Sequence, residues 1–186
     1  MTYRPNDQHH WEFYCDSDFA GNTEENPAEP VKRRSQNGTL AMLNGTPVYW
    51  SSKITSVAFA TPLIGEEHAD TSSGAAEVYC AGNATQDILH LSYVAEEMNI
   101  PFPRPFVLQM DNTAAECFAN NTCFKSKLKH IDNRQEWVKI LRDRDICTPM
   151  HVPTNDNLAD ILTKILPFAT FERLRDRLLY DPAKST

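Results

Sequence analysis

The stretch WEFYCDSDF at residues 11–19 alternates between apolar and polar side chains. Trp11 and Phe13 are apolar, whereas Asp16 and Asp18 fall two residues apart at polar positions. This period of two is typical of a half-buried strand, in which successive side chains point to opposite faces of a sheet. We therefore expect the two aspartates to share one face of the first strand.

Two more strands are predicted downstream of this stretch. A loop rich in Pro, Asn and charged residues spans residues 20–37. Residues 38–43 and 46–52 then flank Asn44-Gly45, which is a strong signal for a two-residue hairpin turn. Three antiparallel strands are therefore expected to open the domain.

A long helix is predicted after the hairpin. From Glu77 onward, apolar side chains recur in steps of three and four, as on one face of a helix, at Ala81, Ala84, Ile88, Leu91, Ala95 and Met98. Glu77 lies on the same face, and three prolines between residues 101 and 105 end the helix. The segment 54–71 has no clear period and is interpreted as an insertion.

The rest of the chain alternates short strands and helices. The predicted elements are a strand at 106–110, a helix beginning at the capping box 113–116, a helix over about 130–143, a strand around 150–152, a helical pattern at 157–164 and a helix at 169–180. This order predicts an α/β fold with a mixed sheet. We expect an N-terminal tail at 1–10, one domain at 11–166, and a C-terminal helix and tail at 167–186.

The composition is that of a globular protein. Of 186 residues, 41% are hydrophobic and 23% charged, and no apolar run exceeds four residues, so no membrane-spanning segment is expected. The five cysteines form no C-x-x-C pair, which favours free thiols in a reducing, intracellular compartment. Glycine-rich phosphate loops, G-x-S-x-G and H-E-x-x-H are all absent from the sequence. We expect Trp50 and Trp137 to be core aromatics.

Four acidic residues lie at positions where an acid contributes little to the stability of a fold. Asp16 lies within a predicted strand, and Glu77 lies on the buried face of a helix, where a carboxylate is costly unless it is paired or binds a metal. Asp111 follows a strand, and Asp160 stands inside the apolar run LADIL. Asp111 could instead cap a helix, and Asp160 could be a solvated helical residue. If Asp16, Glu77 and Asp111 converge, their oxygens would select Mg²⁺ or Mn²⁺.

Seven motifs follow one another over about residues 11–180. They are YCDSDFAG at 14–21, KRRS at 32–35 with Gly38, YWSSK at 49–53, SSGAAE at 72–77, QMDNTAA at 109–115, KHID at 129–132 and VPTNDNLADILTK at 152–164. Together, in this order, they resemble the ribonuclease H domain of copia-type LTR retrotransposon polyproteins. The chain therefore looks like the C-terminal piece of such a polyprotein.

The resemblance implies a ribonuclease H-like fold, a five-stranded mixed sheet with helices on both faces. It also implies an enzyme that cleaves the RNA strand of RNA–DNA hybrids with two Mg²⁺ ions, for which Mn²⁺ can substitute. The implied catalytic residues and metal ligands are Asp16, Glu77, Asp111 and Asp160. The implied partners are the RNA–DNA hybrid and the reverse transcriptase part of the same polyprotein, in the cytoplasm, the nucleus or a virus-like particle.

The chain departs from the family pattern at several positions. Ala75 stands where the family has a first glutamate, although Glu77 matches the catalytic one. The stretch between Lys53 and Glu77 is longer than in the family. The flexible-loop histidine of cellular ribonucleases H has no clear counterpart, and His151, nine residues before Asp160, is a candidate helper in catalysis.

The charge distribution bears on a nucleic-acid partner. A formal charge of −7 disfavours generic affinity for phosphates, but seven Lys and Arg residues face three acids between residues 125 and 144. The candidate phosphate contacts are Arg33, Arg34, Lys125, Lys127, Lys129 and Arg134. Alternatively, the Arg33-Arg34 pair and the basic residues from Lys125 to Arg134 are solvent-exposed surface residues without a role in binding.

Two other functions are considered. An inactive ribonuclease H-like module could be a structural or nucleic-acid-binding subunit of a larger assembly, which the acidic charge and the insertion favour. The four acids argue against it, because an unused cluster of carboxylates only repels itself. An integrase-type nucleotidyl transferase is a third possibility, although the motifs are not those of integrases.

The four acids also make a prediction about the metal-free protein. If their carboxylates are crowded together, at least one of them should have a raised pKa. An Asp16→Asn variant should then be more stable than the wild type without metal.

Overall fold

A computed structural model describes residues 9–22, 34–58, 69–120 and 137–179. The strands are β1 (Trp11–Asn22), β2 (Arg34–Leu43), β3 (Thr46–Ala58), β4 (Phe106–Met110) and β5 (Cys147–His151). The helices are α1 (Ala69–Glu97), α2 (Thr113–Ala119), α3 (Trp137–Asp143) and α4 (Phe168–Leu178), with two short 3-10 helices, η1 (Thr154–Asp156) and η2 (Leu158–Leu162). Within these ranges no helix has the length and apolar character needed to cross a bilayer.

The five strands form one mixed sheet in the order β3-β2-β1-β4-β5. β1, β2 and β3 are antiparallel neighbours, whereas β4 runs parallel to both β1 and β5. The turn between β2 and β3 places Asn44 and Gly45 at φ values of 51° and 72°, as a type I′ hairpin turn requires. The predicted opening of three antiparallel strands is therefore confirmed.

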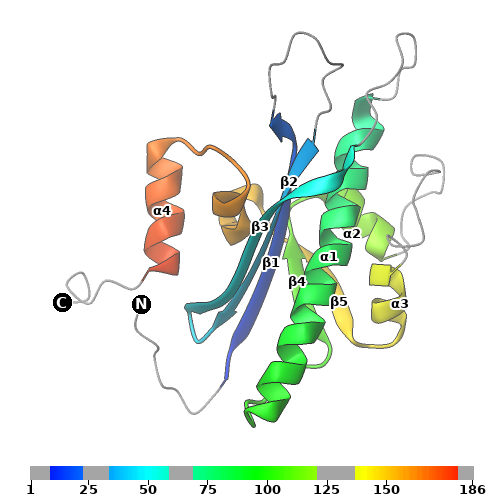
Figure 1. Cartoon of the computed structure of the whole chain (residues 1–186), viewed down its shortest axis with the longest axis vertical. Helices are drawn as coiled ribbons and strands as arrows, with labels where there is room; N and C mark the ends of the chain where they lie inside the picture. The colour runs from blue at the N-terminus through cyan, green and yellow to red at the C-terminus, as the bar shows by residue number, and fades with distance from the viewer. Residues whose placement is uncertain (1–8, 23–33, 59–68, 121–136, 180–186) are drawn as a thin grey trace.

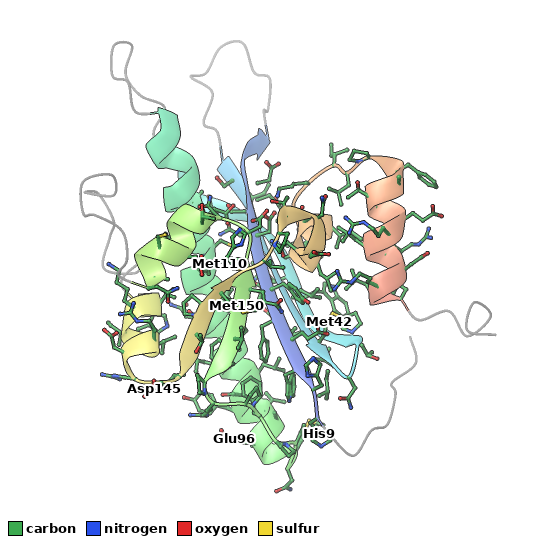
Figure 2. The ribbon with its side chains drawn as sticks, turned by 180° about the vertical axis from the view of Figure 1, so that it is seen from behind. His9, Met42, Glu96, Met110, Asp145 and Met150 are labelled. Atoms are coloured by element: carbon green, nitrogen blue, oxygen red, sulfur yellow. The ribbon has the colours of Figure 1, made fainter. Side chains whose placement is uncertain are left out.

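Helices cover both faces of the sheet (Figure 1). α1, α2 and α3 lie on one face, and η2 and α4 lie on the other. Phe13 of β1 enters the larger core beneath α1 and α3, whereas Tyr14 packs with Leu158 of η2 and Leu174 of α4. Met42 of β2, labelled in Figure 2, belongs to this second core. β1 is therefore buried on both faces rather than half-buried, because a second helical layer covers its polar positions.

Several boundaries differ from the sequence-based prediction. α1 begins at Ala69, eight residues before Glu77, and β3 continues to Ala58. Of the predicted insertion at 54–71, only residues 59–68 lie outside the described part of the chain. The first turns of α1 are built from small and polar residues, so no apolar stripe marked them. The helical pattern at 157–164 is the 3-10 helix η2 rather than an α-helix.

Two apolar side chains predicted to be buried are exposed. Trp50 is 56% exposed, because it faces the α4 side of the edge strand β3, where the second core contains no β3 residue. Its neighbour Tyr49 points to the other face and packs against the larger core, as does Trp137. Met98 is 63% exposed, since α1 ends at the preceding residue.

Candidate metal centre

Asp16 lies at the centre of the candidate site and is fully buried. Thr163 donates its hydroxyl hydrogen to Oδ2 of Asp16, and Lys164 Nζ lies 3.0 Å from Oδ1. The backbone carbonyl of Asp16 accepts a hydrogen bond from Cys80 Sγ at 3.0 Å. Both the side chain and the backbone of this acid are therefore held by neighbours, which fixes the direction of its carboxylate.

Asp111 comes level with Asp16 because of the strand register. In the parallel pair of β1 and β4, Tyr14 pairs with Gln109. Two residues further along the two strands, Asp16 and Asp111 are therefore side by side. Asp111 follows Met110, the last residue of β4, which is labelled in Figure 2. The side chain of Asp111 is 9% exposed.

Glu77 belongs to α1, which packs on one face of the sheet, and its carboxylate lies close to those of Asp16 and Asp111. It is 6% exposed, and its Oε2 is buried without a hydrogen-bond partner among the described residues. Burial, followed by the nearby Cys80, Asp16 and Asp111, raises the pKa of Glu77 well above its ordinary value. Burial is the larger cause of this shift, and the neighbouring acids, to which the sequence-based prediction attributed such a shift, add to it.

These three acids form one compact group. Asp16, Glu77 and Asp111 each offer a carboxylate oxygen that lies within 4.8 Å of the other two. Hard oxygen ligands in this number and proximity suit Mg²⁺ or Mn²⁺. A divalent ion would also supply the missing partner of Glu77, so the residues present fit such an ion.

Asp160, the fourth predicted ligand, lies beside this group and belongs to η2. Asn157 fixes η2 to the sheet, because its side-chain amide donates to the Cys15 carbonyl at 3.0 Å and its oxygen accepts from the Ala159 N–H at 3.1 Å. Asp160 itself is 4% exposed. It is joined to the site by an ion pair with Lys164, with 2.9 Å between Nζ and Oδ1.

Lys164 is the member of the site that sequence reasoning missed. Besides its contacts with Asp160 and Asp16, its Nζ lies 4.0 Å from Asp111 Oδ2. Burial favours the neutral amine, but the carboxylates of Asp16 and Asp160 raise the pKa of Lys164 above its ordinary value. Burial and then Asp16 raise the pKa of Asp160 to about 7, against the effect of Lys164. The signal in the sequence was the Asp-x-x-x-Lys spacing, which pairs opposite charges at i and i+4.

An open groove lies next to Lys164. It is lined by Asp18, Gln36 and residues 161–166. Burial and the charge of Asp16 raise the pKa of Asp18, whereas Lys164 lowers it. Asp18 is not a member of the three-carboxylate group of Asp16, Glu77 and Asp111.

The predicted phosphate contacts fall largely outside the described residues, namely Arg33, Lys125, Lys127, Lys129 and Arg134. Arg34 is the first residue of β2, but its side chain is not described. His151 is exposed at the end of β5, where it pairs with Met110. The roles of all these residues stay predictions.

The curated relatives of the chain are polyproteins. It is 25% identical over 163 residues to the retrovirus-related Pol polyprotein from transposon TNT 1-94 of Nicotiana tabacum, and 27% identical over 165 residues to that from transposon RE2 of Arabidopsis thaliana. These matches cover 88% and 89% of this chain but 11% and 10% of the relatives, so the chain spans about a tenth of their length. A Ty1 Gag-Pol polyprotein of Saccharomyces cerevisiae is 26% identical over 153 residues, which are 79% of this chain and 8% of the relative. No protein-family model matches the chain.

The similar solved structures are ribonucleases H. LC11-RNase H1 in complex with an RNA/DNA hybrid superposes with a TM-score of 0.56 and 14% identity, over 83% of this chain and 94% of that one. An N-terminal ribonuclease H domain from Mycobacterium tuberculosis gives a TM-score of 0.51 and 12% identity, over 88% and 96% of the two chains. The predicted ribonuclease H-like fold and the resemblance to copia-type Pol polyproteins are therefore confirmed.

Proposed function

We propose that the chain is the ribonuclease H domain of a retrotransposon Pol polyprotein and hydrolyses the RNA strand of RNA–DNA hybrids with a divalent cation. The observation that carries the proposal is the buried group of Asp16, Glu77 and Asp111, contributed by β1, α1 and the end of β4. The fold and the Pol relatives support the same assignment.

The cation would be held by these three carboxylates. When bound, Mg²⁺ or Mn²⁺ supplies Lewis-acid chemistry that activates a water and stabilises the leaving oxygen of a phosphodiester. Asp16 would orient its oxygens through Thr163 and Lys164, and Glu77 would gain the partner that its buried Oε2 lacks. We propose Asp160 as the fourth ligand and catalytic residue, which would serve a second ion.

The proposed RNA–DNA hybrid substrate would be recognised through its backbone rather than through its bases. LC11-RNase H1, which shares the fold, was solved with an RNA/DNA hybrid. Recognition of a hybrid rests on backbone and 2′-OH contacts across the minor groove. We propose that Arg33, Arg34 and the basic residues from Lys125 to Arg134 supply the phosphate contacts. The reverse transcriptase part of the same polyprotein is the proposed protein partner.

An intracellular setting is also proposed, in the cytoplasm, the nucleus or a virus-like particle. The described part of the chain agrees with a reducing compartment, because Cys15, Cys80 and Cys147 form no disulfide there.

The experiment compares purified chain on a labelled RNA–DNA hybrid, an RNA duplex and a DNA duplex. We expect the RNA strand of the hybrid to be cut in Mg²⁺ or Mn²⁺ and to stay intact in EDTA, while both other duplexes are spared. A folded protein that binds Mg²⁺ but leaves the hybrid intact would refute the enzyme and support the inactive binding module.

A further inference from the structure

The ammonium group of Lys164 forms ion pairs with three carboxylates of the site. Lys164 Nζ lies 2.9 Å from Asp160 Oδ1, 3.0 Å from Asp16 Oδ1 and 4.0 Å from Asp111 Oδ2. Among the described residues, no other Lys or Arg forms an ion pair with any of these acids. In the described part of the chain, the positive charge in contact with these acids therefore comes from Lys164.

Lys164 is presented by a segment that is packed tightly against the sheet. Ser52 of β3 donates to the Leu162 carbonyl at 2.6 Å. Gly38 of β2 lies so close that a Cβ at its position would be 2.8 Å from Thr163 Cγ2. The backbone N–H of Lys164 itself donates to the Asp160 carbonyl at 3.0 Å. The ammonium is thus held at the cluster by its backbone as well as by the charges that it contacts.

Lys164 contacts the members of the cluster unequally, so that the cluster has a Glu77 side farther from the ammonium and an Asp160 side next to it. On one side, Glu77 has a buried Oε2 without a partner in the described part of the chain, and no ion pair joins it to Lys164. On the other side, Asp16 Oδ1 and Asp160 Oδ1 both accept hydrogen bonds from the Lys164 ammonium, at 3.0 and 2.9 Å. Among the described residues, the first side therefore lacks a cationic partner for Glu77, whereas the second side has an ammonium that belongs to the chain.

We infer that Lys164 is the resident counter-cation of the Asp16–Asp160 side and limits the substrate-free protein to one divalent ion, at Asp16, Glu77 and Asp111. A second ion on the Asp160 side requires the ammonium to leave. Lys164 is therefore a positioning residue that sets metal stoichiometry. This inference rests on the proposed function only in that the three-carboxylate group must bind a divalent ion.

The test is the number of Mn²⁺ ions bound without substrate, measured by calorimetry and by electron paramagnetic resonance. We expect one ion in wild type and in Lys164→Arg, which keeps the charge, and two ions in Lys164→Gln. The double variant Lys164→Gln with Asp160→Asn should bind one ion again, because the second side has lost its acid. Lys53→Gln is the matched control, since Lys53 is exposed on β3, and it should bind one ion.

Two ions in wild type, or one ion in Lys164→Gln with unchanged affinity, would overturn the inference while leaving the metal site intact. If wild type binds no Mn²⁺ at all, the proposed metal site fails, and the inference fails with it. If Lys164→Gln folds only with metal, its melting temperature is followed against Mn²⁺ concentration. The rise should be about twofold steeper than in wild type, because two ions bind only the folded state, and a rise no steeper than wild type would contradict the inference.

Discussion

Glu77→Gln should stabilise the metal-free protein, although it removes a proposed catalytic residue. Glu77 is 6% exposed, and its Oε2 has no hydrogen-bond partner among the described residues. Leaving a buried polar atom unsatisfied costs about 1–3 kcal/mol, and more when the group is charged. Glutamine keeps the size, loses the charge and brings an amide that can donate to Asp16 or Asp111. We therefore expect the free energy of unfolding to rise by about 1–3 kcal/mol at pH 8.

The gain should depend on pH in a direction fixed by the pKa of Glu77. Burial raises this pKa well above its ordinary value of 4.5, so the folded state binds a proton more tightly than the unfolded state. The contribution of Glu77 to the stability of the wild type therefore decreases as pH rises above 4.5, and the decrease is complete above the raised pKa. Because glutamine does not titrate, the difference between variant and wild type should be small near pH 4 and largest at alkaline pH.

Thermal melts in EDTA at matched ionic strength would measure this effect. The expected gain corresponds to about 2–4 °C per kcal/mol for a chain of this size. Glu97→Gln, at the exposed end of the same helix, is the control and should change stability by less than about 0.5 kcal/mol. Added Mg²⁺ should then raise the melting temperature of wild type but not of Glu77→Gln. A Glu77→Gln protein less stable than wild type at pH 8 in EDTA would refute the reasoning.

Three further substitutions test how the site is held. Asp16→Asn should destabilise the metal-free protein by about 1–3 kcal/mol in urea unfolding, because Asp16 already has Lys164 and Thr163 as partners. We therefore replace the sequence-based expectation that Asp16→Asn stabilises the metal-free protein, and expect Glu77→Gln to do so instead. Asn157→Ala should cost about 1–3 kcal/mol by the same measurement, since both its side-chain hydrogen bonds are buried, and no loss would contradict its role in anchoring η2. Gly38→Ala should cost about 1–3 kcal/mol and weaken Mn²⁺ binding, because its Cβ would press against Thr163; unchanged binding in calorimetry would count against the tight packing described.

Much of the fold could be predicted from local patterns. The period-two alternation of β1, the Asn44-Gly45 turn and the apolar stripe of α1 each follow from residues close together in the sequence. The burial of both faces of β1 does not, because the second layer comes from η2 and α4. The start of α1 could not be found in this way, because residues 69–76 carry no apolar stripe. The exposure of Trp50 depends on how far η2 and α4 extend over the edge strand, which is a tertiary property.

In the candidate site, too, the residues of local motifs could be predicted, whereas contacts between distant segments could not. Motifs predicted Asp16, Glu77 and Asp111, and the parallel register of β1 and β4 explains why two of them meet. The contact of Lys164 with Asp16 joins residues 148 positions apart and exists only because η2 folds back over β1 and β2. No local pattern encodes such a contact, although the i and i+4 spacing from Asp160 pointed to half of it.

The most direct test of the central claim is single-turnover cleavage of a hybrid by wild type, Glu77→Gln and Glu97→Gln in Mg²⁺. Wild type and Glu97→Gln should cut the RNA strand at equal rates, leaving 5′-phosphate and 3′-hydroxyl ends. Glu77→Gln should be slower by more than about 100-fold while staying folded, because it loses a ligand of the cation. Cleavage by Glu77→Gln at the wild-type rate would show that the cluster of Asp16, Glu77 and Asp111 is not the catalytic metal centre.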